Sequence, residues 1–315
     1  PLEYVKTIGI VNNGLNGRGF TSPYDSATSR DGRIFVLNRC DPGRRVAIRV
    51  GILNLDEDYL GEFGYGYGEG EGQMRLPVAM AFDSRERLYI TDELNHRVTV
   101  FDIEGKVLDT WGSFGEEAGQ LNGPAGIAID EDDNVYVVDQ HNHRVQKFSA
   151  DGRHLAVWGG PGEGTGQFNM PWGITLDSQG QVYVADWRND RIQKFTPDGE
   201  FVASYGESGG EDGQLSRPSS VAVDPEGYMY VADWGNERVQ VLAPDGGFAL
   251  GLRGQATLSK WADEFLAVNP DESATREMAD LVPELPPHLS RPHDISAQTE
   301  PYFWSPVSVK LDRDG

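Results

Sequence analysis

Three observations in this sequence predict an all-β fold of repeated four-stranded sheets, a six-bladed β-propeller. First, a Gly-Gln pair recurs with a step of 47 residues, beginning at Gly72-Gln73. Second, four residue types keep that step over four copies. They are Pro77, Pro124, Pro171 and Pro218; Asp92, Asp139, Asp186 and Asp233; Asn95, Asn142, Asn189 and Asn236; Arg97, Arg144, Arg191 and Arg238. Third, each unit consists of short β-branched and aromatic runs between Asp-Gly and Asn turns, without a helical period. A repeat of this length is typical of propellers and solenoids.

One repeat unit contains four predicted strands. An apolar run at residues 126–130 precedes a turn at 131–134, and the second and third strands follow at 135–138 and 145–148. An Asp-Gly turn leads into the fourth strand at 154–158, which ends in an aromatic residue and Gly. Four antiparallel strands per unit make one propeller blade. The Asp and the Arg of each unit are five residues apart across the second loop, so we expect a charge-assisted pair that braces it.

The segment HNHRVQKF, with VYVVD before it and an Asp-Gly turn after it, resembles the NHL repeat. The other copies read LNHRVTVF, RNDRIQKF and NERVQVL, and they keep the Asn and the Arg while the His varies. The four regular copies cover roughly residues 72–253, and less regular ones cover most of the rest. The resemblance implies a β-propeller, and by itself it implies no activity.

The two ends of the chain are predicted to meet in one blade. Residues 3–9, EYVKTIG, match the fourth-strand pattern VLDTWG, so the chain begins with an outer strand. Inner strands beginning at six prolines give six blades: Pro23, Pro77, Pro124, Pro171, Pro218 and Pro306. Residues 1–315 are therefore predicted to form one propeller, closed by strand exchange between its ends. Gly315 lies nine residues after Pro306. We expect a continuation resembling VYVAD…NxRVQ, about 20 residues long, to supply the two middle strands of blade six.

An insertion at residues 253–304 separates blades five and six. Pro306 lies 88 residues after Pro218, which is 41 more than the step of 47. Leu258, Trp261 and Phe265 belong to an amphipathic stripe that predicts a helix. A second helix is expected from Asp271 to Val282, and residues 283–301 are expected to be an irregular, Pro-rich connection.

Composition excludes some partner classes. The chain has 50 acidic and 27 basic residues and a formal charge of −23, which argues against nucleic-acid binding. No apolar run is long enough to span a membrane, so we expect a soluble protein without membrane insertion. One cysteine, Cys40, forms no internal disulfide and fits a reducing compartment. We expect a cytoplasmic protein, with a removed leader or anchor as the alternative.

The candidate binding site is the channel mouth. The loops between strands two and three, and those between blades, share this face, so residues following each conserved Pro and Asp are expected to approach it. The candidate ligand-binding residues are Tyr24, Asn38, His141, Trp172, Trp187, Trp234 and Trp304. The tryptophans are expected to form an aromatic platform, and packing between blades is the alternative. The insertion lies over the mouth as a lid, clamps a neighbouring blade, or only stabilises the ring; these alternatives stay open.

Two functions remain from the sequence. The leading hypothesis is a non-enzymatic binding or scaffold module for a protein segment or a small ligand. The alternative is a metal-dependent lyase or lactone hydrolase that uses carboxylates and His141. No cofactor is predicted, with loosely bound calcium as an alternative. The places where amidating lyases with NHL repeats carry zinc-binding His hold no His here. The Gly-rich loops lack Lys and precede strands, so they do not predict a phosphate site.

Overall fold

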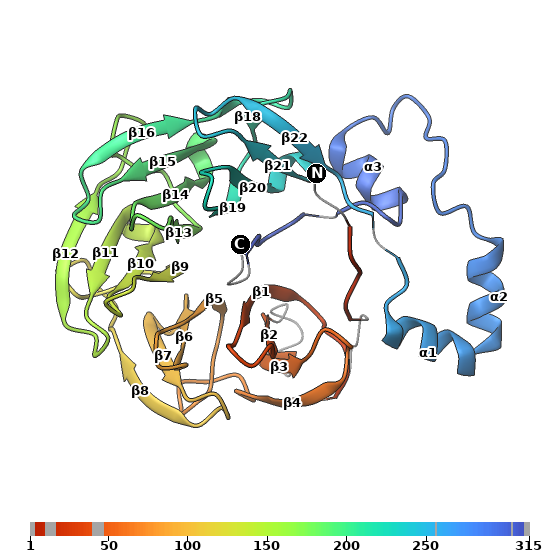
Figure 1. The fold of residues 1–315 in the computed structure, drawn as a ribbon, viewed down its shortest axis with the longest axis horizontal. Helices are drawn as coiled ribbons and strands as arrows, with labels where there is room; N and C mark the ends of the chain where they lie inside the picture. Colours follow the sequence, from red (N-terminus) through yellow and green to blue (C-terminus); the bar gives the residue numbers. More distant parts are fainter. Residues whose placement is uncertain (1–3, 10–16, 40–46, 256, 304, 312–315) are drawn as a thin grey trace.

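The structure is a computed structural model that describes residues 4–9, 17–39, 47–255, 257–303 and 305–311. Five four-stranded antiparallel sheets are arranged radially about a central axis (Figure 1). Each sheet is ordered from an inner to an outer strand, so each is one blade. The predicted propeller is confirmed, and the predicted strands of the repeat unit are correct to within about two residues.

The strands of the five blades are as follows. Blade one consists of β1 (Pro23–Thr28), β2 (Ile34–Asn38), β3 (Arg49–Leu53) and β4 (Tyr59–Phe63). Blade two consists of β5 (Pro77–Phe82), β6 (Leu88–Asp92), β7 (Arg97–Phe101) and β8 (Val107–Trp111). Blade three consists of β9 (Pro124–Ile129), β10 (Val135–Asp139), β11 (Arg144–Phe148) and β12 (His154–Gly159). Blade four consists of β13 (Ile174–Leu176), β14 (Val182–Asp186), β15 (Arg191–Phe195) and β16 (Phe201–Tyr205). Blade five consists of β19 (Pro218–Val223), β20 (Met229–Asp233), β21 (Arg238–Leu242) and β22 (Phe248–Leu252).

Short elements lie in the loops within and between the blades. Three 3₁₀ turns follow the second strands of blades three to five: η2 (Gln140–Asn142), η3 (Trp187–Asn189) and η4 (Trp234–Asn236). A small parallel pair, β17 (Glu207–Ser208) and β18 (Gln214–Leu215), lies between blades four and five.

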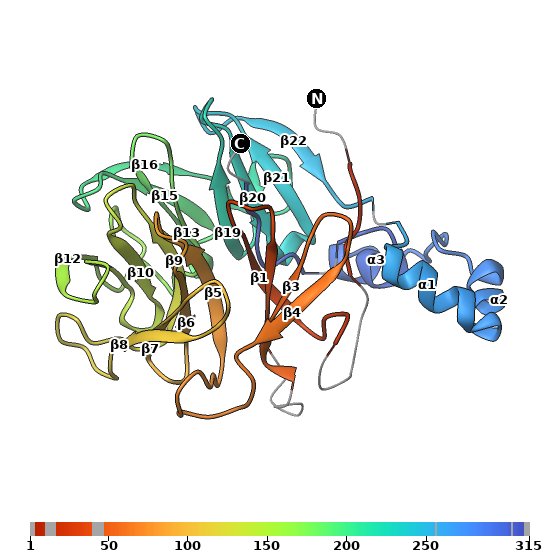
Figure 2. The ribbon, with the colours of Figure 1, turned by 60° about the horizontal axis from the view of Figure 1, so that its bottom comes forward.

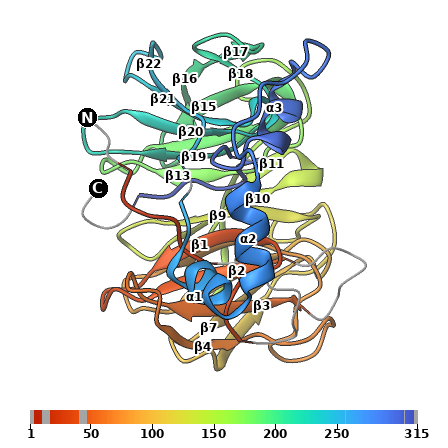
Figure 3. The same cartoon turned by 90° about the vertical axis from the view of Figure 1, so that its right-hand side faces the viewer.

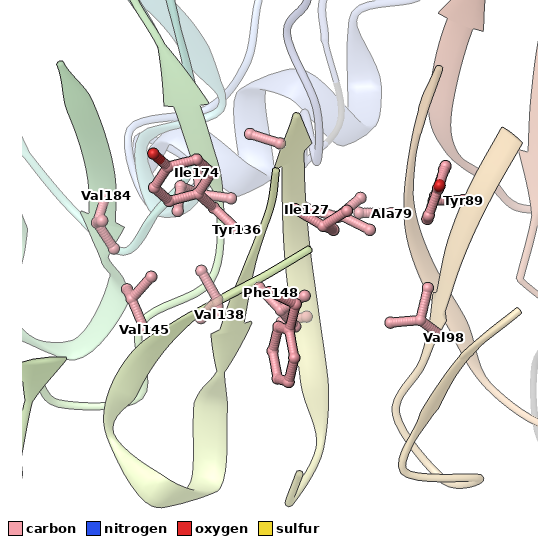
Figure 4. Packing of buried hydrophobic residues seen from close by; sticks show 14 of the residues in the cluster. Ala79, Tyr89, Val98, Ile127, Tyr136, Val138, Val145, Phe148, Ile174 and Val184 are labelled. Atoms are coloured by element: carbon pink, nitrogen blue, oxygen red, sulfur yellow. The ribbon is translucent and has the colours of Figure 1, made fainter. Parts of the chain in front are cut away.

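The hydrophobic core lies between blades. Tyr136, Val138 and Phe148 of blade three are fully buried in a cluster that also includes residues of blades two and four, such as Ala79 and Val184 (Figure 4). Burial of one such large apolar side chain contributes about 1.5–3 kcal/mol. Because adjacent blades share this core, the stability of each blade depends on its neighbours.

A hydrogen bond that repeats with the blades sets their register. His96, His143 and Asp190 have φ between 52° and 53°. Each accepts a bond from a backbone N–H 27 residues further on, those of Gly123, Met170 and Arg217. Glu237 is the fifth-blade equivalent, and it accepts from the N–H of Ser305, 68 residues further on. The extra 41 residues equal the inserted length, so residue 305 stands directly before the inner-strand position of blade six.

The described residues form part of a sixth sector of the ring, which lies between blade five and blade one. Residues 305–311 lie between β19 and β1 near the axis, where Ser219 donates to the carbonyl of Pro306 and Ser308 donates to Asp25 at 2.6 Å (Figure 1). Residues 4–9 lie at the outer side, and Ser259 donates to the carbonyl of Gly9. No strand is assigned to either described segment. Both end segments of the chain therefore lie in this sector, but the predicted strand exchange between them is not present among these described residues.

The insertion contains three helices, α1 (Lys260–Val268), α2 (Pro270–Met278) and α3 (Pro292–Gln298). The first two were predicted, although α2 ends before Val282. The prediction of an irregular connection over 283–301 was wrong at α3, whose first turn begins with Pro292, a residue favoured there. Trp261 of α1 is buried against Phe20, and its Nε1 donates to the carbonyl of Glu57 on blade one.

The insertion lies beside the ring. It runs along the side of the ring from blade one to blade five (Figures 1, 2 and 3). At the blade-five end, His293 of α3 lies 3.1 Å from Glu237. This position fits a clamp between two blades and leaves the channel axis uncovered by the described helices.

Candidate functional site

A buried carboxylate holds the loop at the mouth in blades two to five. Asp139 accepts bonds from the N–H of Asn122 at 2.6 Å, from Asn142 at 2.9 Å, from Arg144 at 2.7 Å and from Gln146 at 3.1 Å. Equivalent bonds to the Arg are made by Asp186 and Asp233. The predicted Asp–Arg pair is therefore present in blades three to five. This pair fixes the position of the residue that directly follows the Asp, such as Trp187 or Trp234.

Blades one and two depart from this arrangement. In blade two, Arg97 donates to backbone carbonyls, and no Asp92–Arg97 bond occurs among the described residues. In blade one, Asn38 stands in the Asp position, and its Oδ1 accepts from the N–H of Thr21 at 3.2 Å. Asn38 is fully buried, so its bonds serve the loop.

The channel itself is narrow. Inner strands approach so closely that a Cβ on Gly126 would lie 2.5 Å from the carbonyl oxygen of Trp172, and the Gly126 N–H donates to that oxygen. The cavity between the inner strands holds about 30 Å³, room for a water molecule. Ligands of organic size are therefore limited to the mouth.

The first mouth cluster joins four blades. Arg39 forms a 2.5 Å ion pair with Glu93, and its guanidinium lies 4.6 Å from the ring centre of Tyr24 and 5.7 Å from that of Trp172. The rings of Tyr24 and Trp172 are 6.3 Å apart. His141 Nε2 lies 3.7 Å from Glu93 on the other side. The result is a stacked cation flanked by two aromatic rings and one carboxylate.

The charges of this cluster perturb its carboxyl and phenol groups. Burial opposes ionisation of Glu93, but the contact with His141 and the charge of Arg39 outweigh it and lower the pKa of Glu93. Burial raises the pKa of Tyr24, against the effect of Arg39. Glu93 is therefore an anion and Tyr24 a neutral phenol at neutral pH, and the cation of Arg39 is held between them.

The second mouth cluster joins blades four and five. The rings of Trp187 and Trp234 are 6.3 Å apart at an angle of 59°. The guanidinium groups of Arg217 and Arg188 lie 5.3 Å and 5.6 Å from the ring of Trp187. Both arginines are exposed and both tryptophans are half-buried. This cluster therefore presents aromatic surface and two positive charges to solvent.

The sequence-predicted residues are distributed over these clusters as follows. Tyr24, His141 and Trp172 lie in the first cluster, and Trp187 and Trp234 lie in the second. The ring contacts among them are Tyr24 with Trp172 and Trp187 with Trp234, and Trp304 lies outside the described residues. Sequence reasoning missed Arg39 and Arg217. Arg39 directly follows Asn38, just as Glu93, Trp187 and Trp234 directly follow the Asp of their own blades. This equivalence in the repeat could have identified Arg39.

The described parts of the chain contain no group of three His, Cys, Asp or Glu residues placed to hold a metal ion. None of the described helices is long and apolar enough to cross a membrane. Cys40 is among the residues that the structure leaves undescribed.

Comparison with known proteins supports the repeat assignment. The family model described as NHL repeat matches residues 121–148, 168–195 and 215–242. Comparison with curated proteins finds no match.

Solved structures share the fold at low identity. A streptogramin B lyase is 16% identical with a TM-score of 0.55, covering 73% of this chain and 68% of that one. A chain of a nidogen/laminin complex is 17% identical with a TM-score of 0.56, covering 73% and 79%. A protein of unknown function from Bacteroides thetaiotaomicron is 16% identical with a TM-score of 0.60, covering 94% and 66%. At these identities the likeness concerns the fold alone.

Proposed function

Because the chain belongs to the NHL-repeat β-propeller family, we propose that its ring is a scaffold whose channel mouth binds a polypeptide segment. The observation that carries this proposal is the pair of half-buried aromatic clusters, each stacked against arginine. Aromatic residues and Arg are the residue types most enriched at binding hot spots. Their position at the ends of loops braced by buried carboxylates keeps them rigid, which lowers the entropic cost of binding.

The shape of the mouth favours a polypeptide over a small ligand. Small-molecule pockets typically enclose about 300–1,000 Å³. The cavity between the inner strands holds about 30 Å³, and the aromatic rings lie around its entrance. An extended segment crossing the entrance contacts both clusters at once, whereas a small molecule reaches only one.

The charges of the second cluster specify the segment further. Arg188 and Arg217 are exposed beside Trp187 in a chain whose formal charge is −23. A carboxylate next to an aromatic or apolar side chain satisfies both the guanidinium groups and the rings. The proposed ligand is thus a segment with an acidic residue beside an apolar one. The nidogen/laminin complex is a precedent for this fold in a protein complex.

Selection and substitution test this proposal together. Peptides that bind the 315-residue chain are selected from a random display library. Calorimetry then measures the affinity of each peptide for the wild type, for Trp187→Ala/Trp234→Ala and for Arg217→Glu. Loss of two hot-spot rings weakens binding by about 30-fold or more. Phe201→Ala, an exposed outer-strand ring in the same blade as Trp187, is the control and keeps the affinity. Unchanged binding with a lowered melting temperature for the double variant means that the rings only pack the blades.

The alternative is a metal-dependent lyase or lactone hydrolase. Its specific support is the pair of His141 and Glu93 at the mouth, whose Nε2 and carboxylate oxygen lie 3.7 Å apart. A catalytic metal normally requires about three protein ligands. Titration of the purified chain with Ca²⁺ and with Zn²⁺ separates the two functions. Stoichiometric binding that His141→Ala abolishes favours the enzyme over the scaffold.

A further inference from the structure

Glu93 stands at a mouth position where the other blades carry no acidic residue. This position directly follows the conserved Asp of each blade, or Asn38 in blade one. In blades one to five it is occupied by Arg39, Glu93, Gln140, Trp187 and Trp234. The repeat itself therefore does not require a carboxylate here, and Glu93 has a role that is specific to the mouth of this chain.

Backbone and side-chain contacts fix the carboxylate of Glu93. Its N–H donates to the carbonyl of Leu76 at 3.0 Å. One carboxylate oxygen accepts from Arg39 at 2.5 Å, and the other lies 3.7 Å from Nε2 of His141. The side chains of Glu93 and Arg39 are only 15% and 13% exposed. Because partly buried charges are screened much less than exposed ones, this pair determines the charge that a ligand meets beside it.

The ion pair cancels the positive charge of the first mouth cluster. The guanidinium of Arg39 lies 4.6 Å from the ring centre of Tyr24 and 5.7 Å from that of Trp172. Arg39 alone would attract a carboxylate that reached these two rings. With Glu93 in place, an incoming carboxylate meets a like charge beside the cation, and like charges brought together at an interface disfavour binding. The first cluster therefore offers aromatic surface without net attraction for an acid.

The second mouth cluster has a different charge balance. Arg188 and Arg217 are both exposed and lie 5.6 Å and 5.3 Å from the ring of Trp187. Among the described residues, neither guanidinium takes part in an ion pair. The carboxylate of Asp190 accepts instead from the backbone N–H of Arg217 at 2.7 Å and from the hydroxyl of Ser208 at 2.6 Å. The second cluster therefore keeps two guanidinium groups for an acidic ligand, and the first cluster does not.

We propose that Glu93 is the specificity-determining residue of the mouth, an inference that rests on the proposed function. Glu93 makes the first cluster accept an uncharged apolar residue and reject an acidic one, whereas the second cluster accepts the acidic residue. Specificity of this kind depends on repulsion of the wrong ligand as well as attraction of the right one. Blade four contributes Trp172 to the first cluster and Trp187 to the second. A segment that crosses the mouth thus lies in one direction, with its acidic end at the second cluster.

The probe is a peptide selected on the wild-type 315-residue chain, together with variants that carry Glu or Gln at each position in turn. Calorimetry measures each peptide against the wild type and against Glu93→Gln. Gln keeps the size of the side chain and an acceptor oxygen for Arg39, so this variant removes the charge. At positions that contact the first cluster, we expect Glu to bind the wild type at least tenfold more weakly than Gln does. In Glu93→Gln this difference disappears or is reversed, which a purely structural role of Glu93 would not produce.

Two further variants test the charge directly. Glu104→Gln removes the same charge from the turn between β7 and β8, at the opposite end of these strands, where Glu104 pairs with Arg33 at 3.2 Å. This control keeps the discrimination against Glu, because the net charge of the chain is not its cause. Arg39→Gln leaves the carboxylate of Glu93 without its guanidinium, so the penalty for Glu at the same peptide positions increases. Melting temperatures of all variants identify any that is misfolded.

Equal discrimination against Glu by the wild type and by Glu93→Gln overturns the inference, because the charge of Glu93 then has no part in it. A wild type that binds the Glu and Gln peptides equally at every position overturns it as well. In both cases, loss of binding in Trp187→Ala/Trp234→Ala leaves the proposed mouth function standing. A selection that yields no peptide dependent on these two tryptophans overturns the proposed function and, with it, the inference about Glu93.

Discussion

Blades two to five and the closing sector of the ring are held together by different kinds of contact. The closing sector consists of blade one, residues 4–9 and residues 253–311. In the regular blades, bonds recur at fixed phase: Asp139 to Arg144, and His143 to the next blade. In the closing sector the contacts are unique, such as Trp261 on Phe20 and Lys310 with Asp25.

One position shows the difference most clearly. Where blade three pairs Asp139 with Arg144, blade one has Asn38 opposite Arg49. The uncharged Asn38 leaves the guanidinium of Arg49 to be neutralised by Glu62 on β4, at 2.7 Å. Arg49 is 1% exposed, so a countercharge is required. Blade one thus neutralises its buried arginine with Glu62, a residue outside the repeat pattern.

Repeated residues therefore specify the blades, and unique residues specify the closure of the ring. A repeated contact stabilises each interface by the same means. The last interface brings together segments that are far apart along the chain, and it includes an insertion of its own. Substitutions in the two regions are therefore expected to differ in kind as well as in size.

The largest effect is expected from Asp139→Ala. This change removes the acceptor of four hydrogen bonds, including the one from the charged Arg144. The free energy of unfolding therefore falls by about 3–5 kcal/mol. Asn38→Ala, the matched change in blade one, removes neutral hydrogen bonds and costs about 1–2 kcal/mol. Urea unfolding followed by Trp fluorescence measures both. Equal losses for the two variants contradict the distinction between the regions.

A smaller and local effect is expected from Trp261→Ala. Loss of the buried ring and its bond to Glu57 removes about 3 kcal/mol of docking stability from α1. Protease cleavage within residues 257–303 then rises by about 100-fold, while the unfolding of the ring shifts little. Phe265→Ala changes an exposed residue of the same helix and serves as the control. Wild-type cleavage rates for Trp261→Ala mean that the insertion is held by other contacts.

The smallest effect concerns the hydrogen bonds between blades. Burial, followed by the charge of His141, lowers the pKa of His96 below 6.5. Just below pH 6.5 the unfolded chain therefore binds more protons than the folded chain. The stabilisation from neutral His96 is complete above pH 6.5 and is lost as the pH falls toward the pKa of His96 in the folded chain. His96→Asp copies the Asp190 type of blade four and flattens this dependence. Urea midpoints at pH 7.5 and 5.5 give the difference, of about 1 kcal/mol or less. An unchanged slope in the variant rules out His96 as the titrating group.

Much of the fold was predictable because it repeats. A step of 47 residues places equivalents of Pro124, Asp139 and Arg144 in blades two to five, and the Asp–Arg bond recurs in blades three to five. The insertion length of 41 was also readable, and the bond from Ser305 to Glu237 confirms the register. The mouth aromatics were predictable as residues after the conserved Pro and Asp, but their grouping was not. Tyr24 meets Trp172 only because the ring brings blades one and four around the same narrow axis.

The residues of one repeat thus define the blade, since short alternating strands, Asp-Gly turns and a buried Asp act over short stretches of chain. How the ring closes depended on contacts between segments separated by hundreds of residues, such as Ser308 with Asp25 and Tyr4 with Thr257. Local periodicity carries no information about such pairs, because each occurs once. The grouping of the mouth residues into two clusters and the lateral place of the insertion are consequences of packing in three dimensions.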